Sequence, residues 1–208
     1  SHMVGRSIES AFLRDPASLD RSFTESTLTV RDLWVDMPGE TVRKVSLDIY
    51  KGEIFGIGGL AGQGKLGIAN GIMGMFPAGG NVTFQNEPIT LNEPRSPLSK
   101  GLAAVFEDRR GVGLLLEEPI SWNIIFTALQ MQEKFLKPYL GGVFRIRDTR
   151  AINECTRYYI NALEIKCVDE NQEVQELSGG NQQKVCLAKA FATRPKLLFV
   201  AEPTRGID

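Results

Sequence analysis

Three glycines and a lysine in the first third of the chain have the spacing of a phosphate-binding loop. The segment from Gly59 to Leu66 reads Gly-Leu-Ala-Gly-Gln-Gly-Lys-Leu. A glycine-rich turn that leads into a helix presents backbone N–H groups to anionic oxygens, and the positive end of the helix dipole adds to the attraction. Lys65 would reach the outer phosphates. The residues that we expect to bind phosphate are Gly59, Gly62, Gln63, Gly64, Lys65 and Leu66.

The last position of this loop is unsuited to metal chemistry. The pattern normally ends in Ser or Thr because that hydroxyl binds magnesium, but this chain has Leu66. An alkyl side chain cannot ligate a metal ion. A glycine turn before a helix can also serve close packing alone, so on these residues by themselves both interpretations stay open.

A second candidate anion site lies near the other end of the chain. It consists of Leu177, Ser178, Gly179, Gly180, Asn181 and Gln182. Ser178 and the two glycines are expected to open a helix, whose N-terminus and hydroxyl suit an anion. Taken alone, Ser178 is better explained as a helix N-cap.

The secondary-structure pattern should place the glycine loop between a strand and a helix. Apolar runs predict a buried strand at 54–57 and a helix over about 65–75, with the loop between them. Alternating runs at 28–30 and 42–49 predict short antiparallel strands, and 102–106 and 197–200 predict buried strands. Residues 119–172 have helical spacing interrupted by Gly141-Gly142, and a further helix is expected over about 180–193.

The composition indicates a globular protein without a bulk charge that attracts nucleic acid. The chain has 208 residues, is 42% hydrophobic and carries a formal net charge of −1. It is therefore long enough to bury a core, and any phosphate recognition must be local. Cys155, Cys167 and Cys186 lack the paired spacing of a zinc site or a disulfide framework. No apolar stretch approaches the roughly 20 residues that cross a bilayer.

The two motifs together resemble the ATP-binding domain of an ABC transporter. The stretch Leu177 to Lys184, the apolar run ending at Ala201 and the sequence from Glu202 to Asp208 occur in the family's order. The Gly-Gly-Asn-Gln-Gln form is similar to the sugar (monosaccharide and nucleoside) import family, in which one polypeptide can carry two ATPase halves. This chain resembles the second half.

The resemblance implies an α/β fold of the ABC ATPase type. It would combine a P-loop core with a mainly parallel sheet, a small antiparallel β subdomain and an inserted helical subdomain, truncated after the Walker B strand. The expected divisions are a tag scar at 1–3, a linker or arm at 4–26, the β subdomain and P-loop core at 27–118, the helical subdomain at 119–176, and the signature helix with the Walker B strand at 177–208.

The resemblance also assigns roles to single residues. Glu202 holds the position of the catalytic base, but Ala201 stands where the family usually has a magnesium-binding Asp. Glu107 holds the Q-loop position, Trp34 is the candidate for stacking on adenine, and Asp208 belongs to the D-loop. A surface or core role for Trp34 stays an equal alternative. The family's switch His would follow Asp208, so we expect this fragment not to complete an ATPase site alone.

The expected function is that of an ATP-binding half of an importer for a sugar or related small solute. Because Leu66 and Ala201 replace the usual magnesium ligands, its own site would bind ATP weakly and depend little on Mg²⁺. The segment 177–182 would instead complete the ATP site of a partner ATPase half. Other expected partners are membrane-spanning permease subunits and, indirectly, a solute-binding protein, at the cytoplasmic face of the cell membrane, without nucleic acid. The alternatives are a soluble ABC-type ATPase and a regulatory nucleotide-binding module.

Overall fold

A computed structural model describes residues 25–202. The expected tag scar at 1–3, nearly all of the arm at 4–26, and Asp208 lie outside the described residues. The helices and strands are β1 (Ser26–Val35), β2 (Val42–Tyr50), α1 (Lys65–Ile72), β3 (Ala78–Phe84), β4 (Glu87–Pro88), α2 (Arg95–Lys100), β5 (Leu102–Val105), α3 (Ile120–Gln132), β6 (Leu136–Tyr139), β7 (Phe144–Arg147), α4 (Thr149–Ala162), α5 (Gly179–Ala192) and β8 (Leu197–Val200).

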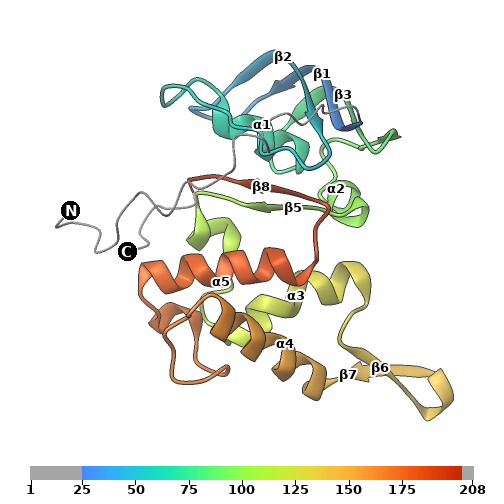
Figure 1. Ribbon diagram of the computed structural model, residues 1–208, viewed down its shortest axis with the longest axis vertical. Coiled ribbons are helices and arrows are strands. Elements are labelled where there is room, and N and C mark those ends of the chain that lie inside the picture. Colours follow the sequence, from blue (N-terminus) through green and yellow to red (C-terminus); the bar gives the residue numbers. More distant parts are fainter. Residues whose placement is uncertain (1–24, 203–208) are drawn as a thin grey trace, which may run out of the picture.

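The molecule is built in layers around the short pair β5 and β8. Figure 1 shows this pair between the β1–β3 sheet with α1 on one side and helices α3, α4 and α5 on the other. Two hydrophobic clusters fill the spaces on either side of the pair. Along β5 the side chains alternate, because Leu102 belongs to the cluster beneath the antiparallel sheet whereas Ala103 and Val105 belong to the helical cluster. A strand buried on both faces explains why this run is continuously apolar.

The antiparallel sheet holds α1 in place. Its strand order is β2-β1-β3-β4, so β1 is flanked on both edges. Leu28, Val30, Leu33 and Val35 of β1 are fully buried. A register shift between Val30 and Leu33 lets the chain keep these four side chains on the core side. Val35 lies against Gly71 of α1 so closely that any side chain at this glycine would collide with it.

The predicted strand at 54–57 is wrong in the structure. These residues join no strand among residues 25–202, and Ile54 and Phe55 are 81% and 40% exposed. The surroundings of this segment explain why it is not a strand. In the described part of the chain β8 pairs only with β5, in parallel. A cavity of about 840 Å³ separates the other edge of β8 from the 54–57 segment. An apolar run becomes a buried strand only where another strand lies within hydrogen-bonding distance. The described parallel sheet is therefore limited to one pair.

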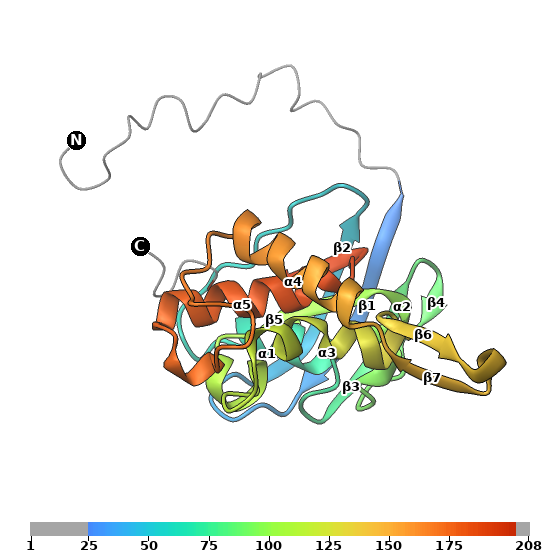
Figure 2. The same ribbon diagram turned by 90° about the horizontal axis from the view of Figure 1, so that it is seen from below.

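The helical part contains a hairpin that the sequence did not predict. Strands β6 and β7 pair antiparallel within the region expected to be helical, and Figure 2 shows them protruding from the helices. Pro138 lies within β6 and Gly141 at the tip has φ 68°, a conformation that favours glycine. The Arg147 guanidinium lies 5.5 Å from the centroid of the Trp122 ring on α3, so the hairpin is anchored to that helix.

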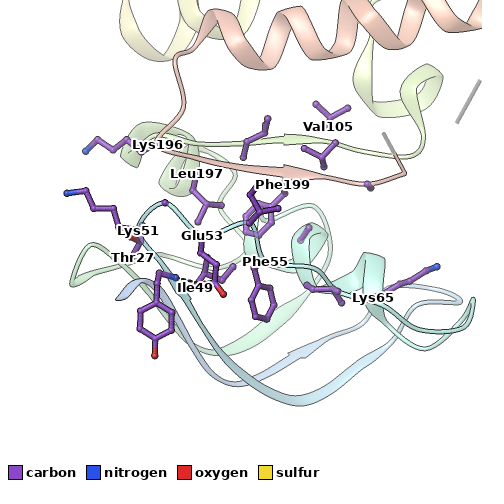
Figure 3. A pocket seen from close by; sticks show the side chains of 18 of the residues that line it. Thr27, Ile49, Lys51, Glu53, Phe55, Lys65, Val105, Lys196, Leu197 and Phe199 are labelled. Atoms are coloured by element: carbon purple, nitrogen blue, oxygen red, sulfur yellow. Dashed lines mark hydrogen bonds between the residues drawn. The ribbon is translucent and has the colours of Figure 1, made fainter. Parts of the chain in front are cut away.

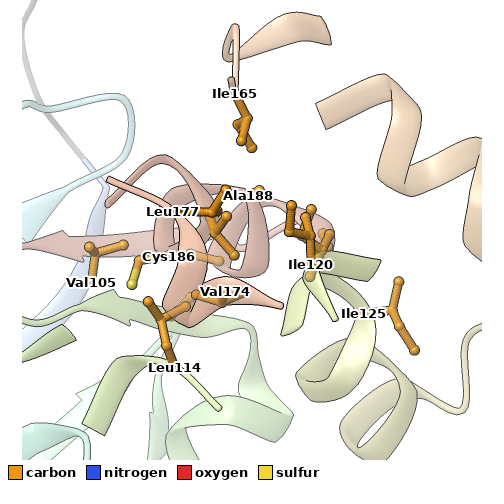
Figure 4. Packing of buried hydrophobic residues seen from close by; sticks show 14 residues of the cluster. Val105, Leu114, Ile120, Ile125, Ile165, Val174, Leu177, Cys186 and Ala188 are labelled. Atoms are coloured by element: carbon orange, nitrogen blue, oxygen red, sulfur yellow. The ribbon is translucent and has the colours of Figure 1, made fainter. Parts of the chain in front are cut away.

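Helix α5 packs into the same hydrophobic cluster as α3. Figure 4 shows Val174, Leu177 and Ala188 from the α5 region together with Ile120 and Ile125 of α3. The packing therefore continues across the expected division at 177, and that boundary stays a prediction. Within residues 25–202, none of the helices combines the length and apolar character needed to cross a membrane.

The different environments of two phenylalanines lead to a stability prediction. Phe84 is 1% exposed and Phe55 is 40% exposed. Replacing Phe84 with Ala should cost about 3–5 kcal/mol because it opens a cavity in the core. Replacing Phe55 with Ala should cost about 1 kcal/mol or less because much of the ring already contacts solvent. Urea unfolding measures both values, and equal costs would mean that the 54–57 segment is packed as a buried strand after all.

The buried end of an ion pair leads to a pH prediction. One oxygen of Glu170 accepts from Arg157 Nε at 3.1 Å and from Nη2 at 2.7 Å, and the Glu170 side chain is only 12% exposed. These bonds lower the pKa of Glu170 below its usual range. The lowered pKa stabilises the fold above the ordinary glutamate pKa, and this contribution is lost as the pH falls through the lowered value.

Thermal melting between pH 7 and pH 3 tests this prediction. The wild-type melting temperature should exceed that of Glu170→Gln at pH 7, and the two should converge in acid. Glu154→Gln is the matched control because Glu154 pairs with Arg150 at an exposed site, where an ion pair contributes little. A constant gap between the wild type and Glu170→Gln at all pH values would contradict the assignment.

Candidate nucleotide-binding site

The glycine loop adopts the conformation that its sequence predicts. Gly62 and Gly64 have φ values of 81° and 85°, in the left-handed region that a residue with a side chain rarely occupies. Gly64 is the N-cap of α1, so Lys65 begins the helix. The Gln63 side chain turns back and accepts a hydrogen bond from Leu60 N at 3.4 Å. The loop therefore precedes a helix as expected, although the segment before it is not a strand.

The turn between β1 and β2 lies directly against this loop. A Cβ at Gly64 would lie 2.7 Å from the Thr41 carbonyl oxygen, and a Cβ at Gly67 would collide with the carbonyl oxygen of Glu40. The glycines at these two positions thus allow the backbone of one segment to touch the backbone of the other. Two segments separated by more than twenty residues in sequence form one surface.

Glu40 brings its carboxylate to the amides of the glycine loop. Its Oε1 accepts from Gly62 N at 2.8 Å, and its Oε2 accepts from Leu66 N at 3.4 Å. The residue is 8% exposed. The pKa of Glu40 is lowered, first by the Gly62 bond, with further contributions from the loop amides and the charge of Lys65, while burial acts in the opposite direction. Sequence reasoning missed this residue, because a glutamate after a Pro-Gly turn carries no signal of contact with a distant loop.

Several of the predicted residues meet around the cavity between α1 and β8. Lys65, Leu66, Ala201 and Glu202 all line it, together with the apolar residues of the 54–57 segment. Figure 3 shows this cavity, with Phe199 on β8, Phe55 on the segment across from it, and the Lys65 amine pointing away from the apolar lining. Glu202 is exposed and has φ 46°. The predicted base and phosphate loop thus border one space.

The two expected magnesium positions do not offer a metal ligand. Magnesium requires oxygen ligands in near-octahedral geometry. Leu66 supplies an alkyl side chain, and Ala201 supplies a methyl group while its N–H donates to Val105 O at 2.9 Å. Within residues 25–202 no group of three His, Cys, Asp or Glu side chains is arranged to hold a metal ion. The residues at these positions therefore do not fit the usual magnesium site.

Two other predicted residues lie on different surfaces. Trp34 is 48% exposed and its indole lies over Gly79 of β3, whereas the adjacent Val35 faces α1. Alternation along a strand directs neighbouring side chains to opposite faces, so the adenine role of Trp34 stays a prediction. Glu107 is exposed directly after β5, beside Asp108, which accepts a hydrogen bond from Gly111 N at 2.9 Å.

The second candidate anion site is the N-terminus of α5. Ser178 is its N-cap by position, but its side chain makes no capping bond to the helix and instead accepts from Asn181 Nδ2 at 2.9 Å. Gly179 and Gly180 form the first turn and are partly exposed. The hydroxyl of Ser178 is exposed rather than used to close the helix end. The interpretation of Ser178 as a helix N-cap therefore holds for its position, but its side chain does not form the capping bond.

The flanking residues of this segment are structural. Leu177 is 7% exposed in the helical core. Gln182 is 1% exposed, and its Nε2 donates to the carbonyls of Val174 and Leu177 at 3.2 Å each. Its Oε1 is buried without a hydrogen-bond partner. The structure thus divides the predicted hexapeptide into buried ends and an exposed centre.

Comparison with known sequences identifies a family. The model of the family described as ABC transporter matches residues 42–205. A ribose import ATP-binding protein of Caldanaerobacter subterraneus is 36% identical over 207 residues, covering 99% of this chain and 39% of the relative. A xylose import ATP-binding protein of Moorella thermoacetica is 35% identical over 212 residues, covering 99% of this chain and 39% of the relative. The chain spans about two fifths of the length of these curated relatives.

Comparison with solved structures supports the same fold. A dimeric bacterial ABC transporter cassette aligns with a TM-score of 0.67 at 21% identity, over 87% of this chain and 76% of that chain. An ATP-binding cassette of an ABC transporter in its ADP conformation aligns with a TM-score of 0.64 at 23% identity, over 89% of this chain and 72% of that chain. These alignments confirm the ABC ATPase fold expected from the sequence. With the family model matching most of its length, the chain belongs to the ABC transporter family.

Proposed function

We propose that this chain is an ATP-binding cassette of an importer for a sugar or a related small solute, and that it acts mainly by completing the ATP site of a partner cassette. The observation that carries the proposal is the exposed N-terminus of α5. There Ser178 is exposed, and Gly179 and Gly180 of the first turn are partly exposed, at the positive end of a helix of 14 residues.

The glycine loop of the same chain supports the proposal that this chain contributes mainly to the partner's ATP site and little through its own. Transfer of a phosphoryl group needs a cation that offsets charge on the β and γ oxygens. Leu66 and Ala201 supply no ligand for such a cation. Glu202 keeps the position of a base, but a base has little to act on without a placed phosphate and metal. The chain's own site therefore binds ATP weakly and turns it over slowly or not at all.

The relatives suggest the process that this cassette serves. The relatives in Caldanaerobacter subterraneus and Moorella thermoacetica are named for ribose import and xylose import. The proposed partners are another ATPase half, permease subunits and, indirectly, a solute-binding protein, at the cytoplasmic face of the membrane. The surface near Glu107 and the inserted helices is the proposed contact with the permease. A soluble ABC-type ATPase and a regulatory nucleotide-binding module are the alternatives.

Substitution of Ser178 tests the role in trans. ATP hydrolysis should rise when this chain is mixed with an intact partner half, and Ser178→Arg should lower that stimulated rate roughly a hundredfold because the arginine fills the anion site and removes one donor. Ser99→Arg is the control, since Ser99 is exposed on α2 and its hydroxyl donates to Ser96 O in the same helix. Unchanged stimulation by Ser178→Arg would contradict the proposal, and hydrolysis that needs no partner would favour a soluble ATPase.

Calorimetric titration of ATP tests the state of the chain's own site. Binding to the wild type should be weak and nearly equal with and without magnesium, because neither Leu66 nor Ala201 holds the ion. The double variant Leu66→Thr with Ala201→Asp restores both ligands and should bind ATP about tenfold more tightly with magnesium than without it. A large magnesium-dependent gain in the wild type would show that another residue supplies the metal ligand.

A further inference from the structure

We propose that the Glu40 carboxylate competes with the nucleotide for the glycine loop. The carboxylate accepts hydrogen bonds from the loop amides, and a phosphate group must displace it in order to bind. The inference rests on the proposed function of this loop in nucleotide binding. In the proposed closed state of the site, the Glu40 side chain bonds the loop amides and no nucleotide is bound.

The geometry is that of an occupied anion site. Gly62 N and Leu66 N, four residues apart in sequence, donate to the two different oxygens of the single Glu40 carboxylate. Both N–H groups belong to the turn that precedes and begins α1, where the helix dipole favours negative charge. Hydrogen bonds from amides to an ionised carboxylate are stronger than those to a neutral acceptor. The same two amides are therefore unavailable to a phosphate while Glu40 remains in place.

Burial of Glu40 indicates that the loop itself compensates its charge. A glutamate is almost never fully buried unless it is paired, and Glu40 is 8% exposed. None of the ion pairs formed within the described part of the chain includes Glu40. The hydrogen bonds that its carboxylate accepts from Gly62 N and Leu66 N both come from the glycine loop. The charge of Lys65 adds attraction to the Glu40 carboxylate at longer range.

The backbone around Glu40 holds the carboxylate in position. Glu40 N donates to Met37 O at 3.0 Å, closing a turn that contains Gly39 with φ 77°. The carbonyl of Glu40 touches Gly67, and a Cβ at Gly62 would lie 3.4 Å from Gly39 O. The turn thus contacts the loop at several positions. Release of the carboxylate requires a rotation of its side chain or a movement of this turn.

Competition of this kind lowers the apparent affinity for nucleotide. When the binding-competent form is only a fraction of the molecules, the apparent dissociation constant rises by the inverse of that fraction. A closed form that holds about nine tenths of the molecules therefore weakens binding about tenfold. The closed form also gives the amides an acceptor when no nucleotide is present, so the loop keeps its shape.

The test compares Glu40→Gln with the wild type and with Asp148→Asn. Glutamine keeps the size of the side chain and one oxygen acceptor but removes the charge. Asp148 is the matched control, because its carboxylate also accepts a backbone hydrogen bond at the start of a helix, from Ala151 N at 3.2 Å, and it does not line the cavity beside the glycine loop. The probes are inorganic pyrophosphate and ATP without magnesium, titrated by calorimetry.

We expect Glu40→Gln to tighten the binding of both probes about tenfold or more, and Asp148→Asn to leave it unchanged. If Glu40→Gln binds the probes equally to the wild type or more weakly, the proposed competition is wrong. If the wild type and all variants fold but bind neither probe, the phosphate-binding role of the loop fails as well, which separates the two proposals. If magnesium strengthens ATP binding in the wild type and Glu40→Gln abolishes that gain, Glu40 is a metal ligand and the competition is wrong.

A measurement on the wild-type chain does not depend on the folding of a variant. With ¹³C-labelled glutamate, the side-chain carboxyl signal of Glu40 is followed by NMR as pyrophosphate is added. Displacement predicts that this signal moves toward the value of a solvent-exposed carboxylate as the Gly62 and Leu66 amide signals shift. If the amide signals shift while the Glu40 signal stays constant, phosphate binds without displacing the carboxylate and the proposal is wrong.

Discussion

The backbone N–H groups of the glycine loop need an acceptor, and much of the surrounding structure depends on how that need is met. In the loop shaped by left-handed Gly62 and Gly64, the Gln63 side chain accepts from Leu60 N, whereas Gly62 N and Leu66 N take their acceptor from outside the loop. Glu40 supplies the oxygens, and the β1–β2 turn is pressed against α1 to bring it there. The absence of side chains at Gly64 and Gly67 is what allows this close approach.

The two candidate anion sites differ in what surrounds them. The glycine loop faces a carboxylate and borders the alkyl side chains of Leu66 and Ala201. The N-terminus of α5 presents the exposed Ser178 hydroxyl and no buried charge. A helix end that retains its free donors attracts an anion from outside, whereas one that already bonds a carboxylate must exchange it. This physical difference underlies the proposed division between the chain's own site and the site of a partner.

The layered fold places these two sites on different hydrophobic clusters. Helix α1 packs with the antiparallel sheet, and α5 packs with α3 and α4, while β5 and β8 lie between them (Figure 1). Each site is therefore positioned by its own set of core contacts. In the helical cluster the buried Gln182 ties the α5 N-terminus to the preceding turn through two carbonyls, so the exposed centre of the segment is held by its buried ends.

The sequence by itself determined the elements whose signals are local. The spacing of Gly59, Gly62 and Gly64 before Lys65 was enough to predict a loop entering a helix, and the run 197–200 was enough to predict β8, because backbone freedom and apolar periodicity are written in adjacent residues. Tertiary structure decided the rest. The 54–57 run is exposed because a strand needs a neighbour that its own residues do not specify, and Glu40 reaches the loop because two glycines leave room for a distant turn. Contacts of this kind depend on which segments meet in space, and no local pattern encodes them.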